Sequence, residues 1–224
     1  EELFNGWKDK KFGESKGLDA LVGNRQLDVI IGGPPCQAYS VAGRIRDEHG
    51  MREDYRNYLF ESYLKVVQHY KPRVFVFENV PGILSAKPGD GSVRIIDLIQ
   101  KAFADAGYAV LPDLSNAIID MTEYGVPQNR KRIIILGVSK EHYGDKAEAM
   151  VEKFYSSYLP EYKIEKKATV RDAIGDLPKL RPLDEPISYL GRKLSHSVSD
   201  PLINGHISRF HNKRDIELFK FLEE

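Results

Sequence analysis

Short apolar segments that predict buried strands alternate along this chain with longer segments that predict amphipathic helices. Residues 28–31 (DVII) and 73–77 (RVFVF) are strand-like, and the apolar residues of 56–70 between them recur on one face of a helix. A second helix is predicted over 92–106, with Ser92 as its cap and Gly107 as its terminator. Further strand-like segments follow at 108–111, 116–119 and 132–138.

Strands and helices that alternate in this order are typical of an α/β protein, and they predict a parallel sheet covered by helices on both faces. In such a sheet, ligands bind in the crevice outside the carboxyl ends of the strands. The loops that follow residues 31 and 77 are therefore the first places to look for a functional site.

The composition limits the class of protein and its location. The 224 residues are 42% hydrophobic and 29% charged, as in ordinary globular proteins, and 33 Lys and Arg balance 33 Asp and Glu. No apolar segment reaches the ~18 residues that span a bilayer, and we expect no signal peptide. One cysteine excludes an internal disulfide and a CxxC motif, which favours a cytoplasmic location. The histidines show no metal-ligand spacing, so no metal is expected.

The single cysteine, Cys36, follows the strand at 28–31 after the stiff turn GGPP. The two glycines allow close approach of a ligand, and the two prolines fix the backbone. A lone cysteine is more often a buried small hydrophobe than a nucleophile, but this one stands at the carboxyl end of a strand. A free thiol is mostly protonated at neutral pH, so Cys36 as a nucleophile needs an activated electrophile or a neighbouring cation.

Two other polar segments stand at strand ends. Glu78 and Asn79 lie in FVFENV, where a desolvated acid can keep its proton and donate it to a ring nitrogen. In YGVPQNRKRIIILG, the residues Gln128, Arg130 and Arg132 alternate, so they face one side of an extended segment. Each segment alone also fits a structural interpretation, as a capping acid in the first and as basic residues protecting a sheet edge in the second.

Together, GGPPCQAYS, FENVPGIL and YGVPQNRKRIIILG resemble the 5-methylcytosine DNA methyltransferases in order, spacing and flanking strands, over residues 28–140. TVRDAIGDLP at 169–178 and HISRFHNKRDIELFKFL at 206–222 resemble the approach to that family's target-recognition region and its beginning. The resemblance implies a Rossmann-like, S-adenosylmethionine-dependent methyltransferase sheet with helices on both faces. It also implies a partial catalytic core over 1–166, followed by a linker and the start of the target-recognition region over 167–224.

The reaction that this resemblance implies is transfer of a methyl group from S-adenosylmethionine to carbon 5 of cytosine in DNA through a covalent adduct. Cys36 matches the thiol that adds to carbon 6 of the ring, and Glu78 matches the acid that holds ring nitrogen 3. Arg132 matches the arginine that contacts the base, and Arg130 and Gln128 are supporting residues.

The resemblance also suggests contacts to the methyl donor and to DNA. Pro34, Pro35 and Asn79 are the candidate contacts to S-adenosylmethionine. Residues 37–56 match the loop that closes over DNA, although the mixed charge of this segment equally suits a solvated, flexible loop. The candidate DNA contacts in it are Gln37, Ser40, Arg44 and Arg46.

Two parts of the family pattern are missing, the glycine-rich FxGxG motif before Cys36 and the late motifs after residue 224. We therefore expect a fragment that is inactive alone. Double-stranded DNA is the expected partner, and the protein is expected to be a monomer that works with a cognate restriction endonuclease or stands alone. The same reaction on transfer RNA and a non-catalytic nucleic-acid-binding relative remain alternatives, whereas a thiol hydrolase lacks its Cys/His/Asp pattern.

Overall fold

The computed structural model describes residues 1–35, 59–87, 92–198, 203 and 205–223, which form two compact units, Glu1–Lys167 and Ala168–Glu224. No helix within these ranges is long and apolar enough to cross a membrane. The α-helices of the first unit are α1 (Glu2–Asn5), α2 (Gly17–Val22), α4 (Leu59–Tyr70), α5 (Ile95–Asp105), α6 (Lys140–Tyr143), α7 (Lys146–Lys153) and α8 (Leu159–Glu161). Its strands are β1 (Trp7–Asp9), β2 (Gly13–Ser15), β3 (Val29–Gly32), β4 (Val74–Asn79), β5 (Tyr108–Ala109), β6 (Ile118–Asp120) and β7 (Lys131–Ser139).

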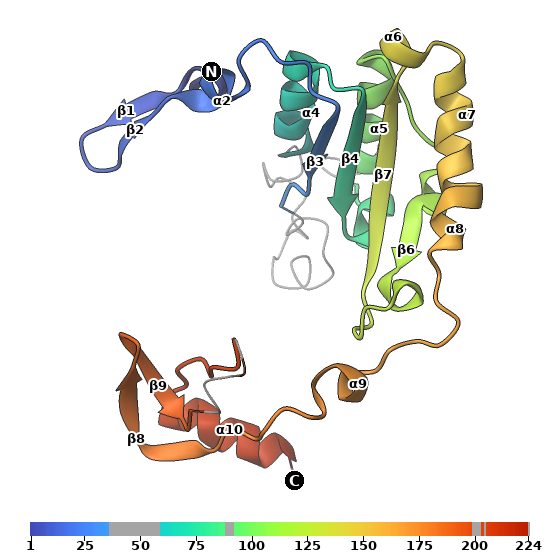
Figure 1. Ribbon diagram of the computed structural model, residues 1–224. Coiled ribbons are helices and arrows are strands. Elements are labelled where there is room, and N and C mark those ends of the chain that lie inside the picture. Colours follow the sequence, from blue (N-terminus) through green and yellow to red (C-terminus); the bar gives the residue numbers. More distant parts are fainter. Residues whose placement is uncertain (36–58, 88–91, 199–202, 204, 224) are drawn as a thin grey trace. The chain divides into compact units, whose positions relative to one another are not determined.

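A five-stranded sheet occupies the centre of the first unit (Figure 1). Its order is β3-β4-β7-β5, and β6 also pairs with β7. Only β3 and β4 are parallel, because β7 runs antiparallel to β4, β5 and β6. The prediction of a parallel sheet is therefore wrong at β7. The connection from β6 to β7, residues 121–130 with a 3-10 turn at Met121–Tyr124, allows an antiparallel return and contains no crossover helix of the kind that joins parallel strands.

The two long helices predicted from the sequence are confirmed as α4 and α5. The N-cap of α5 is Arg94 instead of Ser92, and the left-handed Gly107 (φ 85°) follows the end of the helix as predicted. The predicted strand at 108–111 is reduced to the two residues of β5, and the one at 116–119 begins as a 3-10 turn before β6.

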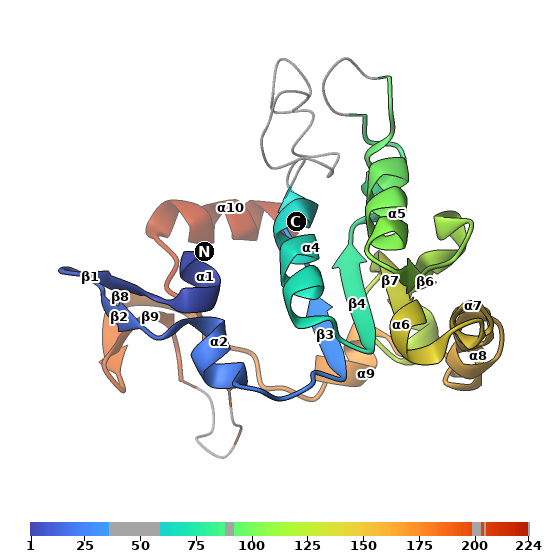
Figure 2. The ribbon, with the colours of Figure 1, turned by 90° about the horizontal axis from the view of Figure 1, so that it is seen from above.

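Helices α4 and α5 lie side by side on one face of the sheet (Figure 2). The ring of Tyr63 in α4 meets Phe75, Phe77 and Phe103 edge-on, with centroids 6.1, 5.4 and 6.2 Å away. Burying each Phe ring contributes about 1.5–3 kcal/mol. The Tyr63 hydroxyl donates to the Ile30 and Val76 carbonyls at 3.2 and 3.0 Å, so this helix also fastens β3 to β4.

The opposite face of β3 has a different environment. Val29 and Ile31 alternate along the strand with the half-buried Ile30, and their side chains are 51% and 75% exposed. Helix α7 packs on β7 and β5, and it continues through a π-helical turn (Phe154–Tyr158) into α8. The Tyr155 hydroxyl in that turn donates to the Ile134 carbonyl and accepts from Leu136 N.

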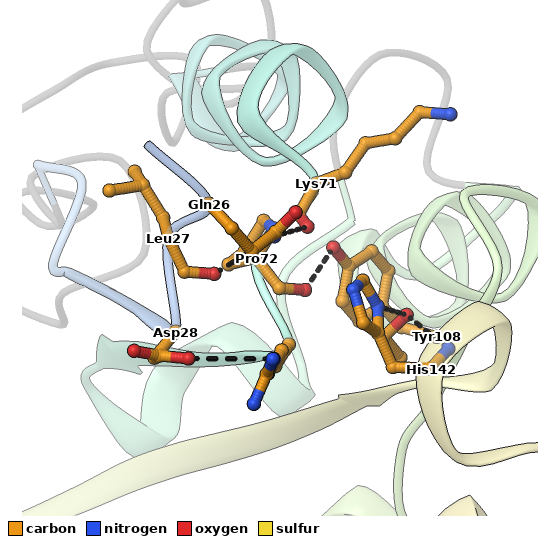
Figure 3. Close-up of polar contacts among 9 residues, drawn as sticks. Gln26, Leu27, Asp28, Lys71, Pro72, Tyr108 and His142 are labelled. Atoms are coloured by element: carbon orange, nitrogen blue, oxygen red, sulfur yellow. Dashed lines mark hydrogen bonds and ion pairs between the residues drawn. The ribbon is translucent and has the colours of Figure 1, made fainter. Parts of the chain in front are cut away.

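The amino ends of β3 and β4 are joined by contacts to the main chain (Figure 3). Gln26 Nε2 donates to the Lys71 carbonyl at 3.0 Å, and the Tyr108 hydroxyl donates to the Pro72 carbonyl at 2.8 Å. Arg73 Nε lies 3.5 Å from the Asp28 carboxylate. These contacts secure the chain where it enters the two parallel strands.

The second unit contains α9 (Val170–Ile174), the antiparallel pair β8 (Pro182–Tyr189) and β9 (Arg192–His196), and α10 (Lys213–Glu223). Helix α9 begins with a capping box in which the side chains of Thr169 and Asp172 each accept from the other's main-chain N–H. A tight turn joins β8 to β9, and its residues Leu190 and Gly191 both have positive φ angles. Ser195, which is 2% exposed, accepts from His211 N and so ties the segment before α10 to this hairpin.

Candidate active site

The candidate site lies where β3 and β4 end side by side in parallel. Their backbone pairing runs from Val29 opposite Val74 to Gly32 opposite Phe77. The two residues after Ile31 must be glycines, because other side chains occupy the space that a Cβ atom would need. A Cβ atom at Gly32 would lie 2.5 Å from the Tyr63 ring, and one at Gly33 would lie 2.8 Å from Glu78 Oε2. The sequence suggested that these glycines admit a ligand, and the structure shows that they admit two side chains of the same chain.

Glu78 is the centre of the charged part of the site. Its Oε1 atom lies 2.7 Å from Arg132 Nε and 3.9 Å from Arg130 Nη2. Within the described ranges of the chain, its Oε2 atom accepts no hydrogen bond. One carboxylate oxygen is therefore held by arginine, and the other is directed toward the turn after β3.

The antiparallel register of β4 and β7 brings these charges together. Glu78 lies opposite Ile134, so Arg132, two residues along β7, is on the same face and diagonal to it. Arg132 is only 17% exposed, and its Nη1 donates to the Lys131 carbonyl at 2.8 Å, which fixes the guanidinium. A charge-assisted bond to a partly buried arginine orients a carboxylate more firmly than a flexible surface pair does.

Asn79, the last residue of β4, is buried with 1% of its surface exposed. Its Nδ2 atom donates to the Pro34 carbonyl at 3.2 Å, and its Oδ1 atom accepts from Val80 N at 2.9 Å. Both polar ends of this amide are therefore engaged inside the chain. Pro34 and Pro35 are the other two residues predicted to contact S-adenosylmethionine. Pro34 is half-buried and Pro35 is exposed.

The structure brings together some of the predicted residues and leaves others apart. Glu78, Arg132 and Arg130 form one cluster, and Asn79 joins it to the turn at Pro34. Gln128 is exposed, and its main-chain N–H donates to the Val126 carbonyl in the loop before β7. The predicted residues that lie outside the described part of the chain are Cys36, Gln37, Ser40, Arg44 and Arg46.

Tyr63 has a role in this region beyond the apolar helix face predicted over residues 56–70. Burial raises the pKa of its hydroxyl, which keeps it protonated as the donor to the two strands. A tyrosine on an otherwise apolar helix face was the available signal, because a buried hydroxyl needs a partner.

Comparison with known proteins places this geometry in a family context. Residues 5–213 match the family described as C-5 cytosine-specific DNA methylase. The type II methyltransferase M.Bpa9945I of Bacillus paralicheniformis is 44% identical over 162 residues, which are 70% of this chain and 33% of the relative. The type II methyltransferase M.XorII of Xanthomonas oryzae pv. oryzae is 35% identical over 167 residues, 74% of this chain and 33% of the relative. The chain thus spans about a third of the length of these relatives.

A solved structure has a similar fold over most of this chain. It is that of an E. coli protein assigned as a DNA modification methyltransferase encoded within a prophage. The two are 26% identical and superpose with a TM-score of 0.52, over 77% of this chain and 41% of the other. The mixed α/β sheet described above is therefore shared with that protein.

Proposed function

Because this chain belongs to the C-5 cytosine-specific DNA methylase family, we propose that the protein containing it transfers a methyl group to carbon 5 of cytosine in DNA. The observation that carries the proposal is the carboxylate of Glu78. Arg132 holds one of its oxygens, and the other is directed toward the turn that leads to Cys36. A carboxyl group in this position can hold a cytosine ring while a thiol attacks it.

The proposed reaction proceeds through covalent catalysis by Cys36. Its thiolate forms a bond to carbon 6 of the ring, and the electrons of the 5,6 double bond shift toward carbon 5. Carbon 5 then attacks the methyl group of S-adenosylmethionine, whose sulfur–methyl bond breaks and leaves a neutral thioether. The carbon-5 proton is released to solvent, and the bond between the Cys36 sulfur and carbon 6 breaks as the 5,6 double bond returns. The thiolate is regenerated, so the step balances without an oxidant or a metal ion.

Glu78 and the two arginines have separate roles in this proposal. Glu78 forms a hydrogen bond with ring nitrogen 3 and so makes carbon 6 more electrophilic. A weak thiol nucleophile needs this activation of the ring. Arg132 orients Glu78 and contacts the base, with Arg130 beside it and Gln128 as a support from the preceding loop. The cytosine must leave the duplex to reach them, at a cost of a few kcal/mol of stacking and pairing.

S-adenosylmethionine, the methyl donor that the family implies, supplies an electrophilic methyl group. Of the described residues, the exposed Pro35 and the half-buried Pro34 fit an apolar contact with it. Gln37, Ser40, Arg44 and Arg46 are the proposed DNA contacts, and the second unit is the proposed start of the target-recognition region. We also propose a cytoplasmic monomer that acts on double-stranded DNA, either with a restriction endonuclease or alone.

Bisulfite sequencing of DNA from cells that express the whole protein tests this function. New methylcytosines at one short motif are expected, and a Cys36→Ala control should lose them all. If neither sample gains methylcytosine, the DNA reaction is wrong. Transfer RNA from the same cells would then be sequenced, since the same chemistry on RNA is the first alternative. Retained DNA binding without methylation in both samples would indicate a non-catalytic relative.

A further inference from the structure

Asn79 differs from the other polar residues near the candidate site because it is almost completely buried. It is 1% exposed, whereas the side chain of the adjacent Glu78 is 37% exposed. A buried amide is stable only when its donor and acceptor are both paired. In Asn79 they are paired with the Pro34 carbonyl and with Val80 N.

The partner of Asn79 continues the register of the two parallel strands. Backbone pairing of β3 and β4 ends at Gly32 opposite Phe77, and Pro34 and Asn79 each lie two residues beyond that last pair. Prolines have no main-chain N–H and cannot extend a ladder of hydrogen bonds. The Asn79 side chain joins the two segments beyond the end of the ladder, because its amide donates to the Pro34 carbonyl at 3.2 Å.

We propose that Asn79 is a positioning residue, which keeps the Pro34 main chain in register with β4 and so fixes the segment that enters Cys36. The role concerns the reactive thiol, so it rests on the proposed function. Reacting groups must be held within about 0.5 Å of their productive geometry, and a misplacement of about 1 Å can reduce the rate 100-fold. A side chain that is this buried favours the positioning role over contact with the methyl donor.

The test uses the whole protein and a readout of thiol addition alone. Reversible addition of Cys36 to carbon 6 makes the hydrogen on carbon 5 exchangeable, so duplex DNA with tritium at cytosine carbon 5 should lose tritium to water without any methyl donor. In Asn79→Asp, the carboxylate can still accept from Val80 N but can no longer donate to the Pro34 carbonyl. We expect tritium release to slow by about 10-fold or more, with DNA affinity changed less than about 2-fold.

Tyr63→Phe is the matched control, since the Tyr63 hydroxyl joins the same two strands at Ile30 and Val76. This variant should lose stability, while its folded fraction should release tritium at the wild-type rate. Asn79→Ser, which puts no charge in the buried position, provides the comparison if Asn79→Asp does not fold.

The outcomes separate the positioning role from the proposed function. Equal release rates in the Asn79 variants and in Tyr63→Phe, with exchange intact in the wild type, would overturn the positioning role alone. Unfolding of both Asn79 variants would give Asn79 a structural role and would also overturn it. Absence of exchange in the wild type itself would overturn covalent addition by Cys36, and the positioning role with it.

Discussion

The two ends of the β3–β4 pair use their polar side chains differently. At the amino end, Gln26 and Tyr108 each donate to a main-chain carbonyl, and these hydrogen bonds hold the chain in place just before β4 (Figure 3). At the carboxyl end, Glu78 is held by arginine side chains through one oxygen only, and its second oxygen stays open toward the turn after β3.

This difference indicates how one sheet divides its tasks. A hydrogen bond from a side chain to a buried carbonyl, such as that of Pro72, stabilises the fold, because an unpaired carbonyl would be costly there. An oriented charge with an unused oxygen contributes little to stability at a partly exposed position, but it is suited to binding a polar ring. Substitutions at the carboxyl end should therefore change activity, and those at the amino end should change stability.

The largest effect is expected from Glu78→Gln. The amide keeps the shape of the side chain, but it has no charge for Arg132 to hold and no acidic proton to share with ring nitrogen 3. We expect methyl transfer to fall by about 100-fold or more, with less than about 1 kcal/mol change in the free energy of unfolding. Single-turnover methylation and urea unfolding measure the two quantities. A stability loss large enough to explain the lost activity would contradict the idea that the carboxyl end of the strand pair serves activity and the amino end serves stability.

Gly33→Ala should reduce activity by about 10-fold. Its Cβ atom would lie 2.8 Å from Glu78 Oε2, so the carboxylate must move from its place over the turn. The same single-turnover assay measures the change.

Gly137→Ala is the control for that substitution, because its Cβ atom would lie 2.0 Å from the Phe75 ring in the core. Overpacking there should lower stability by about 1–3 kcal/mol without a specific loss of activity in the folded fraction. If Gly33→Ala behaved in the same way, Glu78 would not depend on the space that Gly33 leaves.

Tyr108→Phe tests the amino end. Burial raises the pKa of Tyr108 to about 12, so its hydroxyl remains a donor to the Pro72 carbonyl at neutral pH. Removing it leaves that carbonyl without this bond and should cost about 1–2 kcal/mol of unfolding free energy, while methyl transfer stays at the wild-type rate. Urea unfolding gives the first quantity. A selective loss of activity would show that the amino end also serves the reaction.

The smallest effect is expected in the second unit, outside both ends of the sheet. Burial, followed by the charge of His211, lowers the pKa of His196 below its ordinary value. The unfolded chain then binds more protons than the folded one as pH falls below about 6.5. His196 should therefore contribute stability at pH 7.5 that is lost at pH 5.5. In His196→Asn, urea unfolding at the two pH values should show a smaller difference, and an unchanged difference would exclude this residue as the cause.

Much of the first unit was predictable from local patterns in the sequence. The strands at 28–31 and 73–77 and the two helices that follow them have clear periodicity, and each is present within a few residues of its predicted bounds. Each motif that identifies the family is a continuous segment of the sequence. No knowledge of the fold was therefore needed to locate Glu78 and Arg132 or to relate them to a chemistry.

The partners of these residues were decided by tertiary structure. Periodicity predicts a strand at β7, but not its direction, and only antiparallel pairing with β4 puts Arg132 diagonal to Glu78. The burial of Asn79 and its bond to the Pro34 carbonyl likewise follow from the register of β3 with β4. The sequence alone was enough to propose which residues carry the chemistry, because local composition encodes motifs and periodicity. Only the pairing of distant strands, which depends on chain connections and packing, determined how those residues meet.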